Sequence, residues 1–443
     1  MEKAANRIYE FLAEDEDSRV CRDIPESACH EQPRSFTRQL LALVLTKFGD
    51  TLVSARLVLA WMLAALGAPA VFIALLVPLR ESLALLPQLF IAQAMRRRPL
   101  RKYFWVWGSI GQAAALAGMV PAVVLLDGAA VGVAVIGLLV VFSLARGVCS
   151  VASKDVLGKT VSKSRRGRLT GSAASAAGFA TLLAAVFLLF GPGLEHWQGT
   201  AISGQRGLFA VILAGAALLW LAAALAYARI PEVPGATEGG GNAIVEAVAS
   251  LSLLRSDPVF RRFVIARALL VATAFAIPYL VVLIQRAGNG GSVQLGALLF
   301  ANGAAGLLSG PLWGRWSDRG AHRVMAGAAI LGTGVTLVAL AFHYLMPAWL
   351  GAAPTAGLLL FGAAVAHQGA RVGRKTYLVD MATGETRASY TAVSNTVIGL
   401  FLLAGAALGA VDAWLGTAAV LWFLAALGIV AAIRSLSLPA VSG

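Results

Sequence analysis

Two acidic residues lie inside apolar stretches of the sequence, where a carboxyl group could do chemistry. Beyond residue 38 the chain has thirteen acids, and all except Asp50 and Glu81 fall in connections or at the ends of apolar segments. A carboxylate inside a bilayer is costly, so it usually faces a cavity, pairs with a base or takes up a proton. We therefore predict that Glu81 and Asp50 are proton-coupling groups. The alternatives are a structural ion pair between Glu81 and an arginine of a neighbouring helix, and a shallow Asp50 that complements the dipole of a helix start.

Arginines accompany these acids within the apolar segments. They are Arg56, Arg80, Arg146, Arg267 and Arg371. Arg80 and Glu81 are adjacent, and adjacent residues of a helix do not face each other, so these two need not pair. We assign Arg80 to the lining of a substrate cavity.

Polar side chains near the end of the sequence offer hydrogen bonds. His367 and Gln368 lie in one apolar segment and Asn395 in the next. A histidine can bind a substrate or carry a proton, and all three residues are predicted to line the substrate cavity. The alternative for each is a hydrogen bond that ties neighbouring membrane helices together.

The composition shows what must position these residues. Of 443 residues, 58% are hydrophobic and 13% are charged, whereas about a quarter of the residues of an average soluble domain are charged. A membrane-spanning helix needs about 20 apolar residues. The sequence predicts twelve such helices, at residues 40–67, 69–94, 104–126, 129–152, 169–191 and 207–229, and at 260–286, 293–314, 324–346, 354–375, 388–411 and 413–433. The predicted fold class is therefore all-α integral membrane.

A segment rich in proline, glycine and polar residues separates the two sets of helices. It predicts a cytoplasmic linker at residues 230–258 that does not pack, with a short amphipathic helix at 243–254 that ends before Asp257 and Pro258. The remaining boundaries are a polar N-terminal tail (1–39), an N-terminal six-helix bundle (40–229), a C-terminal six-helix bundle (259–435) and a C-terminal tail (436–443).

The distribution of basic residues predicts the orientation. Connections after spans 2, 4, 8 and 10 hold seventeen lysines and arginines, whereas those after the odd spans hold only Arg206 and Arg286. Cytoplasmic loops carry the excess of bases, so both termini are predicted to be cytoplasmic, in a bacterial inner membrane. The net charge of +14 then reflects topology, and no nucleic-acid partner is expected. The three cysteines are expected to be reduced, and no metal site is expected.

An internal repeat marks the cytoplasmic ends of the fourth and tenth spans. Arg146 precedes Asp155 by nine residues, and Arg371 precedes Asp380 by the same number. Six-plus-six symmetry predicts such pairs. We expect these four residues to serve an inner gate.

The connection between spans 8 and 9 resembles the signature of the major facilitator superfamily. That signature has Gly, three residues, Asp-Arg, one residue, Gly and two bases, and the sequence reads Gly314-Arg-Trp-Ser-Asp318-Arg319-Gly-Ala-His-Arg323. In the corresponding first-half loop, Met95 stands where the acid should be. The resemblance covers about residues 40–435 and assigns a cytoplasmic gate, with Asp318 as its latch, to Gly314, Asp318, Arg319 and Arg323.

The resemblance implies secondary transport by alternating access, in which two six-helix bundles rock around a central site. Arg56 and Arg267 occupy the first helices of the two halves, which line the cavity in this family. Two such arginines can bind a carboxylate or phosphate with paired hydrogen bonds, so an anionic or zwitterionic solute is the expected cargo. Alternatively, Arg56 pairs with Asp50 or Glu81, and Arg267 extends to the inner headgroups.

Other classes of protein lack support in the sequence. There is no Walker loop, no Gly-x-Ser-x-Gly and no pair of histidines at metal-binding spacing, so neither an enzyme nor an ATP-driven pump is expected. No cofactor is expected, because a proton or other ion gradient would supply the energy. The expected partners are a small-molecule substrate and the bilayer, with the protein as a monomer. Two alternatives stay open: a flippase of lysolipids or lipid-linked substrates with the same fold, and a membrane sensor or scaffold that transports nothing.

Overall fold

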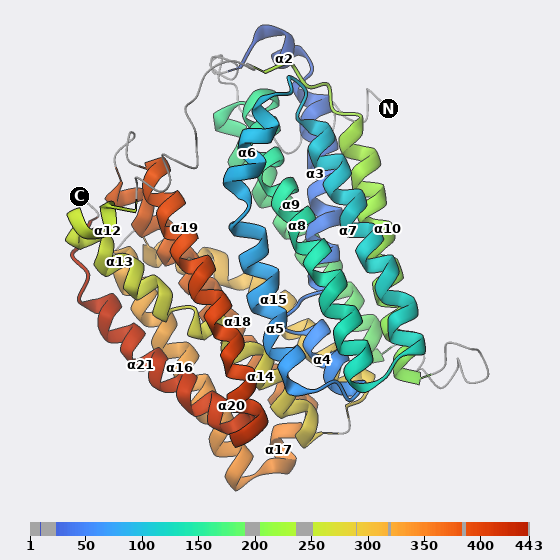
Figure 1. Ribbon diagram of the computed structural model, residues 1–443, viewed down its shortest axis with the longest axis vertical. Helices are drawn as coiled ribbons and strands as arrows, with labels where there is room; N and C mark the ends of the chain where they lie inside the picture. The colour runs from blue at the N-terminus through green and yellow to red at the C-terminus, as the bar shows by residue number, and fades with distance from the viewer. Residues whose placement is uncertain are drawn as a thin grey trace.

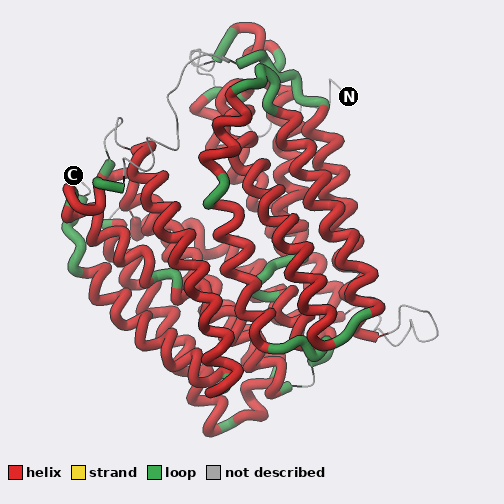
Figure 2. Tube along the Cα trace, viewed as in Figure 1, coloured by secondary structure: helices red, strands yellow, loops and turns green. Residues whose placement is uncertain are grey.

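Helices make up all the regular structure of the described residues (Figure 2). The computed structural model describes residue 9 and residues 24–190, 204–235, 251–288, 290–317, 320–382 and 387–441. Within these ranges, ten helices are long and apolar enough to cross a membrane. The chain is therefore an all-helical integral membrane protein, as its composition predicted.

In the N-terminal half, residues 24–235, the second predicted span lies on the side that faces the C-terminal half (Figure 1). Its helices are α2 (Glu26–His30), α3 (Gln32–Leu52), α4 (Val58–Ala65), α5 (Ala70–Leu85), α6 (Gln88–Arg96), α7 (Lys102–Leu125), α8 (Gly128–Thr160), α9 (Lys163–Phe190) and α10 (Gly204–Ala228). Helix α7 packs along α8 and α10, and α5 packs along α8. Helix α3 packs between α9 and α10.

The C-terminal half, residues 251–441, is built in the same way. Its helices are α12 (Leu253–Ser256), α13 (Pro258–Leu269), α14 (Ala272–Ala287), α15 (Ser292–Ser317), α16 (Ala321–Leu345), α17 (Pro347–Gly351), α18 (Ala353–Met381), α19 (Arg387–Ala404), η2 (Gly405–Ala407), α20 (Leu408–Leu415) and α21 (Thr417–Leu436). Helix α18 packs between α15 and α16, and α16 packs along α21. The two halves meet where α9 packs on α15, and α5 on α19 and α20.

Two of the twelve predicted spans differ from the other ten. Residues 40–67 and 354–375 are helical, as parts of α3 with α4 and of α18, but neither segment is among the ten helices that meet the length and hydropathy needed for a span. The first is interrupted between Leu52 and Val58, and the other carries His367, Arg371 and Arg374.

The first long helix of each half is broken near its middle. Helix α3 ends at Leu52, and α4 begins only at Val58. The carbonyl oxygen of Val53, freed by the break, accepts a hydrogen bond of 2.9 Å from Arg80, which meets the need of a buried carbonyl for a donor. In the other half, the chain breaks between α13 and α14 at Leu270 and Val271. Both breaks lie beside the cavity described below.

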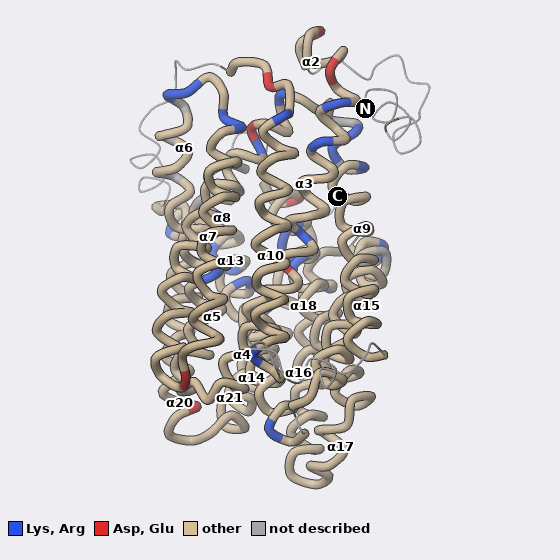
Figure 3. The backbone as a smooth tube through the Cα atoms, turned by 90° about the vertical axis from the view of Figure 1, so that its right-hand side faces the viewer, with Lys and Arg blue, Asp and Glu red and all other residues tan. Residues whose placement is uncertain are grey.

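A hydrophobic core joins the two halves at the end of the molecule away from α2, where α4 and α14 lie (Figure 1). Trp61 and Tyr279 are buried there, one from each half. Gln285 Nε2 donates to the Trp61 carbonyl at 3.2 Å, and Gln205 Nε2 donates to the Gly290 carbonyl at 2.6 Å. Lysines and arginines gather instead at the α2 end and around mid-height (Figure 3). The two halves therefore pack and hydrogen-bond together at the end of the molecule that has few charged side chains.

The start of the predicted linker is packed against the charged end of the N-terminal half, contrary to the expectation that it does not pack. The fully buried carboxylate of Glu232 accepts hydrogen bonds from the backbone nitrogens of Arg101 and Lys102, at 2.9 and 2.7 Å, and pairs with Lys159 at 3.1 Å. A carboxylate is favourable there because the first N–H groups of α7 carry partial positive charge. The predicted amphipathic helix at 243–254 lies largely outside the described residues.

The prediction that all three cysteines are reduced is wrong for Cys29, which takes part in a disulfide bond.

Candidate functional site

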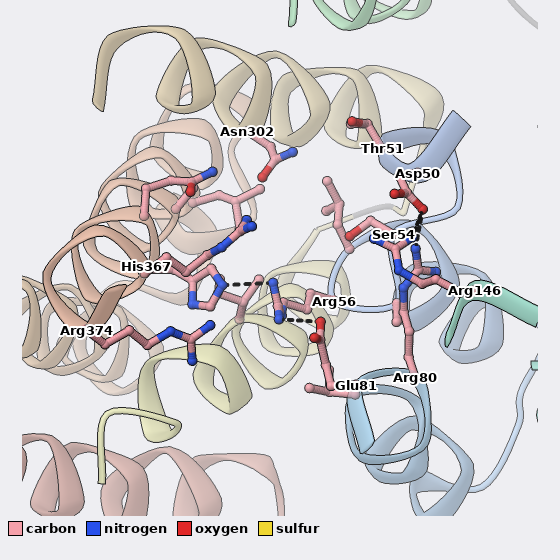
Figure 4. A pocket seen from close by; sticks show the side chains of 18 residues that line it. Asp50, Thr51, Ser54, Arg56, Arg80, Glu81, Arg146, Asn302, His367 and Arg374 are labelled. Carbon is pink, nitrogen blue, oxygen red and sulfur yellow. Dashed lines mark hydrogen bonds and ion pairs between the residues drawn. The ribbon is translucent and has the colours of Figure 1, made fainter. Parts of the chain in front are cut away.

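Two adjoining cavities lie inside the molecule, between the halves. One has a volume of about 300 Å³ and the other about 430 Å³. Both are bordered by the same five residues, which are Arg56, Glu81, His367, Arg371 and Arg374. The smaller cavity lies around the break between α3 and α4, and the larger one borders Lys154 and Lys375. Figure 4 shows the smaller cavity from close by.

Asp50 is the centre of a cluster of arginines at the end of α3. Its Oδ1 pairs with Arg80 at 2.8 Å and also with Arg146. The guanidinium group of Arg80 lies 5.0 Å from the centre of the Phe142 ring, within reach of a cation–π interaction. Arg80 is buried, and Asp50 together with the Val53 carbonyl supplies its acceptors. Asp50 and the two arginines beside the first break therefore stabilise one another.

Arg56 connects the two halves through a second cluster. It pairs with Glu81 at 2.7 Å, and its other terminal nitrogen lies 2.9 Å from His367 Nε2 (Figure 4). A guanidinium group only donates hydrogen bonds, so Nε2 must be the acceptor and the proton of a neutral His367 must be on Nδ1. Protonation of His367 would place two donors face to face and break this contact.

Arg267 has only neutral partners among the described side chains. It is 8% exposed, and it donates to Asn395 Oδ1 at 2.8 Å and to the hydroxyl of Ser394, both on α19. Its Nε has no partner. A buried charge of this kind is costly unless it is paired with an opposite charge. The side chain borders the larger cavity.

The linings of the two cavities are strongly basic. Eight basic residues border them, against two acids, Asp50 and Glu81. The eight are Arg56, Arg80, Arg146, Lys154, Arg267, Arg371, Arg374 and Lys375. Both acids already pair with arginines. Arg371, Arg374 and Lys375 make no ion pair or hydrogen bond in the part of the chain that the structure describes.

The structure places other polar residues of the predicted site at the same cavities. Gln368 borders the smaller one, together with Asn302, and Asn395 borders the larger one. The sequence analysis did not assign Asn302, Lys154, Arg374 or Lys375 to the site. The signal for the last two was present in Arg371-x-x-Arg374-Lys375, whose spacing puts all three bases on one face of a helix.

The structure gives the partners of the residues expected at an inner gate, and their assignment to a gate stays a prediction. Arg146 pairs with Asp50, while Asp155 pairs with Arg101 and with Lys159. Nine residues of a helix span about 13 Å, so an arginine and an aspartate at this spacing do not touch. Likewise, Arg371 faces the cavity, and Asp380 is exposed near the end of α18.

The predicted latch lies outside the described residues, since these exclude Asp318 and Arg319. The residues around it are described. Gly314 lies in the last turn of α15, and Arg323 lies in the first turn of α16. The assignment of these four residues to a gate stays a prediction.

Comparisons with known proteins relate this fold to transporters. No protein-family model and no curated protein sequence matches the chain, but many solved structures do. A D-xylose–proton symporter is 14% identical with a TM-score of 0.66, covering 92% of this chain and 98% of its own. A POT family transporter in complex with 5-aminolevulinic acid is 11% identical with a TM-score of 0.69, covering 91% and 95%. A bacterial homologue of the human lysosomal transporter Spinster is 13% identical with a TM-score of 0.61, covering 92% and 98%.

These likenesses extend over nearly the whole chain and agree with the motif at Gly314–Arg323. The chain is an integral membrane protein with the fold of the major facilitator superfamily. Within this fold, the two halves enclose cavities with a strongly basic lining.

Proposed function

We propose that the chain is a secondary transporter that moves a small organic anion across the membrane by alternating access. Twelve helices in two bundles would rock around the cavity, with both termini in the cytoplasm of a bacterial cell. The core around Trp61 and Tyr279 closes one end, while the larger cavity borders Lys154 and Lys375, which belong to the basic end. With that orientation, the cavity faces the cytoplasm.

The observation that carries this proposal is the charge of the cavity. Its lining has six more bases than acids, because eight bases face two acids, and both acids are already paired. Unpaired charges in a site of low dielectric bind a counter-charge strongly. A neutral or cationic solute would leave the bases without any such partner, whereas an anion neutralises them.

The experiment is a thermal-shift screen of the purified protein against carboxylated, phosphorylated and neutral hydrophobic compounds. A ligand that binds only the folded state raises the melting temperature by mass action. We expect stabilisation by anions, and loss of that stabilisation in Arg371→Gln. Arg434→Gln is the matched control, because it removes an exposed base at the end of α21 that does not border the cavities. Stabilisation by neutral compounds alone would refute the anionic cargo.

Proton coupling is the second part of the proposal, and Glu81 is its best candidate. Its side chain is 40% exposed to the cavity and pairs with Arg56, whereas Asp50 is 25% exposed and is held by two arginines. An anion bound at Arg371 and Arg374, which border the same cavities as Arg56 and Glu81, would attract Arg56 away from Glu81, and Glu81 would then be free to take a proton. In proteoliposomes, Glu81→Gln should abolish flux driven by a pH gradient while equilibrium exchange of the solute continues. Unchanged gradient-driven flux in that variant would exclude Glu81.

A lipid substrate is the nearest alternative, because part of the lining of the larger cavity is apolar. Leu270, Ile398 and Leu402 border this cavity together with the bases of α18. An anion with an apolar tail would suit both kinds of lining residue. A non-transporting sensor, in contrast, would bind a ligand but show no flux in the proteoliposome assay.

A further inference from the structure

The unpaired bases of the cavity all belong to one half of the molecule, apart from Lys154. The C-terminal half contributes Arg267, Arg371, Arg374 and Lys375 to the two linings, and no acid. The N-terminal half contributes both acids, Asp50 and Glu81, and its arginines are paired with them. The sequence predicted that Arg56 and Arg267 bind the anion as a symmetric pair. Of these two, Arg267 alone lacks an acidic partner, because Arg56 is already paired with Glu81.

Three of these bases follow one face of α18. Arg371, Arg374 and Lys375 are separated by three and four residues, so they lie side by side on the helix. Like charges at this spacing destabilise a helix unless an anion lies between them. Arg371 and Arg374 are close enough for their charges to repel each other. Arg374 extends into the cavity beside Arg56 and His367 (Figure 4).

Arg267 completes the group from a second helix, α13. Its charge is close enough to repel that of Arg374, and its bonded partners Ser394 and Asn395 are both neutral. The burial of Arg267, at 8% exposure, makes its missing counter-charge costly. Guanidinium groups on two helices thus approach the same part of the larger cavity.

We infer that the anionic group of the cargo is a phosphate monoester, and that Arg267, Arg371 and Arg374 bind it. This inference rests on the proposed function and specifies its substrate class. A carboxylate brings one negative charge and two oxygens, whereas a phosphate monoester brings a charge of about −1.5 to −2 and three strong acceptor oxygens. The flat guanidinium groups suit phosphate oxygens because they donate paired hydrogen bonds. A phosphate monoester group is present both on soluble phosphomonoesters and on the lipid lysophosphatidate.

The test compares probes of similar size and different charge on the full-length protein in detergent. Phenyl phosphate, phenyl sulfate and benzoate share the aromatic ring, but only phenyl phosphate is doubly charged at pH 7.5. We expect phenyl phosphate to bind at least tenfold more tightly than the other two in thermal-shift titrations. Because its second pKa is about 6, its affinity should fall about tenfold between pH 7.5 and 5, while that of phenyl sulfate should not. Equal affinities for the phosphate and the sulfate at pH 7.5 would overturn the inference.

Variants and lipid probes complete the design. Arg374→Gln should reduce the affinity for phenyl phosphate at least tenfold and reduce the preference over phenyl sulfate, while Arg434→Gln should change neither. The wild-type pH series keeps the inference testable if Arg374→Gln does not fold.

Lipid probes distinguish the two sources of a phosphate monoester. Tighter binding of lysophosphatidate than of phenyl phosphate, with no binding of lysophosphatidylcholine, would assign the phosphate to a lipid. The reverse order would assign it to a soluble solute. If benzoate and phenyl sulfate bind as well as phenyl phosphate, the anion carrier stands and the phosphate class falls. If no anion binds, the proposed function falls as well.

Discussion

The two cavity acids should differ in what they contribute to stability, and replacing each by its amide measures the difference. Asp50→Asn removes the charge that neutralises Arg80, whose side chain is 9% exposed. Glu81→Gln removes the charge beside Arg56, whose side chain is 22% exposed and whose partner is 40% exposed. The two substitutions are chemically identical, so the surroundings alone decide the outcome.

The expected magnitudes follow from burial. Breaking a buried ion pair by removing one partner costs about 3–5 kcal/mol, because the other charge is left without compensation. Asp50 keeps partial access to the cavity, and an asparagine oxygen still accepts one hydrogen bond from Arg80. We therefore expect a loss of about 2–3 kcal/mol for Asp50→Asn. Exposed ion pairs are worth about 0–1 kcal/mol, so Glu81→Gln should cost less than about 1 kcal/mol.

The assay is thermal unfolding of both variants in the same detergent, followed by tryptophan fluorescence. On the scale of large domains, 2–3 kcal/mol corresponds to a fall of roughly 5 °C in the melting temperature. The double variant Asp50→Asn/Arg80→Gln should recover part of this loss, because it removes Arg80, one of the two arginines that Asp50→Asn leaves without a counter-charge. Equal losses for Asp50→Asn and Glu81→Gln, or strictly additive effects in the double variant, would refute the assignment of Asp50 as the counter-charge of Arg80.

Three further predictions concern structure outside the cavity. Asp257 caps α13, and although burial raises its pKa, hydrogen bonds from Tyr390 and from backbone amides of α13 outweigh this and lower the pKa of the folded protein. Asp257→Ala should therefore cost about 1 kcal/mol at pH 7, and the difference in melting temperature should shrink as the pH falls below about 4, where the unfolded carboxyl is protonated. Glu232→Ala should leave the backbone nitrogens of Arg101 and Lys102 without an acceptor and Lys159 with Asp155 as its remaining partner, so limited trypsinolysis after Arg229 should be several-fold faster. Gly351→Ala should cost about 1–3 kcal/mol, because its Cβ would lie 2.4 Å from a backbone oxygen, whereas Gly215→Ala, with open space around it, should be neutral in thermal unfolding.

The sequence identified the charged residues of the cavity and, as an alternative, the ion pair between Arg56 and Glu81, but not the two arginines that pair with Asp50. Asp50 and Glu81 stand out because an acid in an apolar segment is rare. Which arginine each one meets depends on the break after Leu52, which turns the chain and frees the Val53 carbonyl for Arg80. No proline lies between residues 50 and 58 to announce that break, so a continuous helix was the natural prediction.

The basic face of α18 was missed for a different reason. The tenth span was predicted to end at residue 375, and Arg374 and Lys375 at its end were counted with the bases of the cytoplasmic connection that follows. The helix continues to Met381, so both residues lie on its side and border the cavity. Mean hydropathy cannot show that the helix continues, because a basic residue lowers the mean hydropathy of its segment equally whether it faces water in a loop or water in a cavity.

The buried carboxylate of Glu232 has a consequence for how the halves can move. It fixes the start of the linker to α7 and α8, and Gly235 is held as well, because its backbone nitrogen donates to the Pro99 carbonyl at 3.0 Å. Residues 230–235 therefore belong to the N-terminal half and move with it. A deletion that removes Glu232 should accordingly disturb the N-terminal half itself, and not only its connection to the C-terminal half.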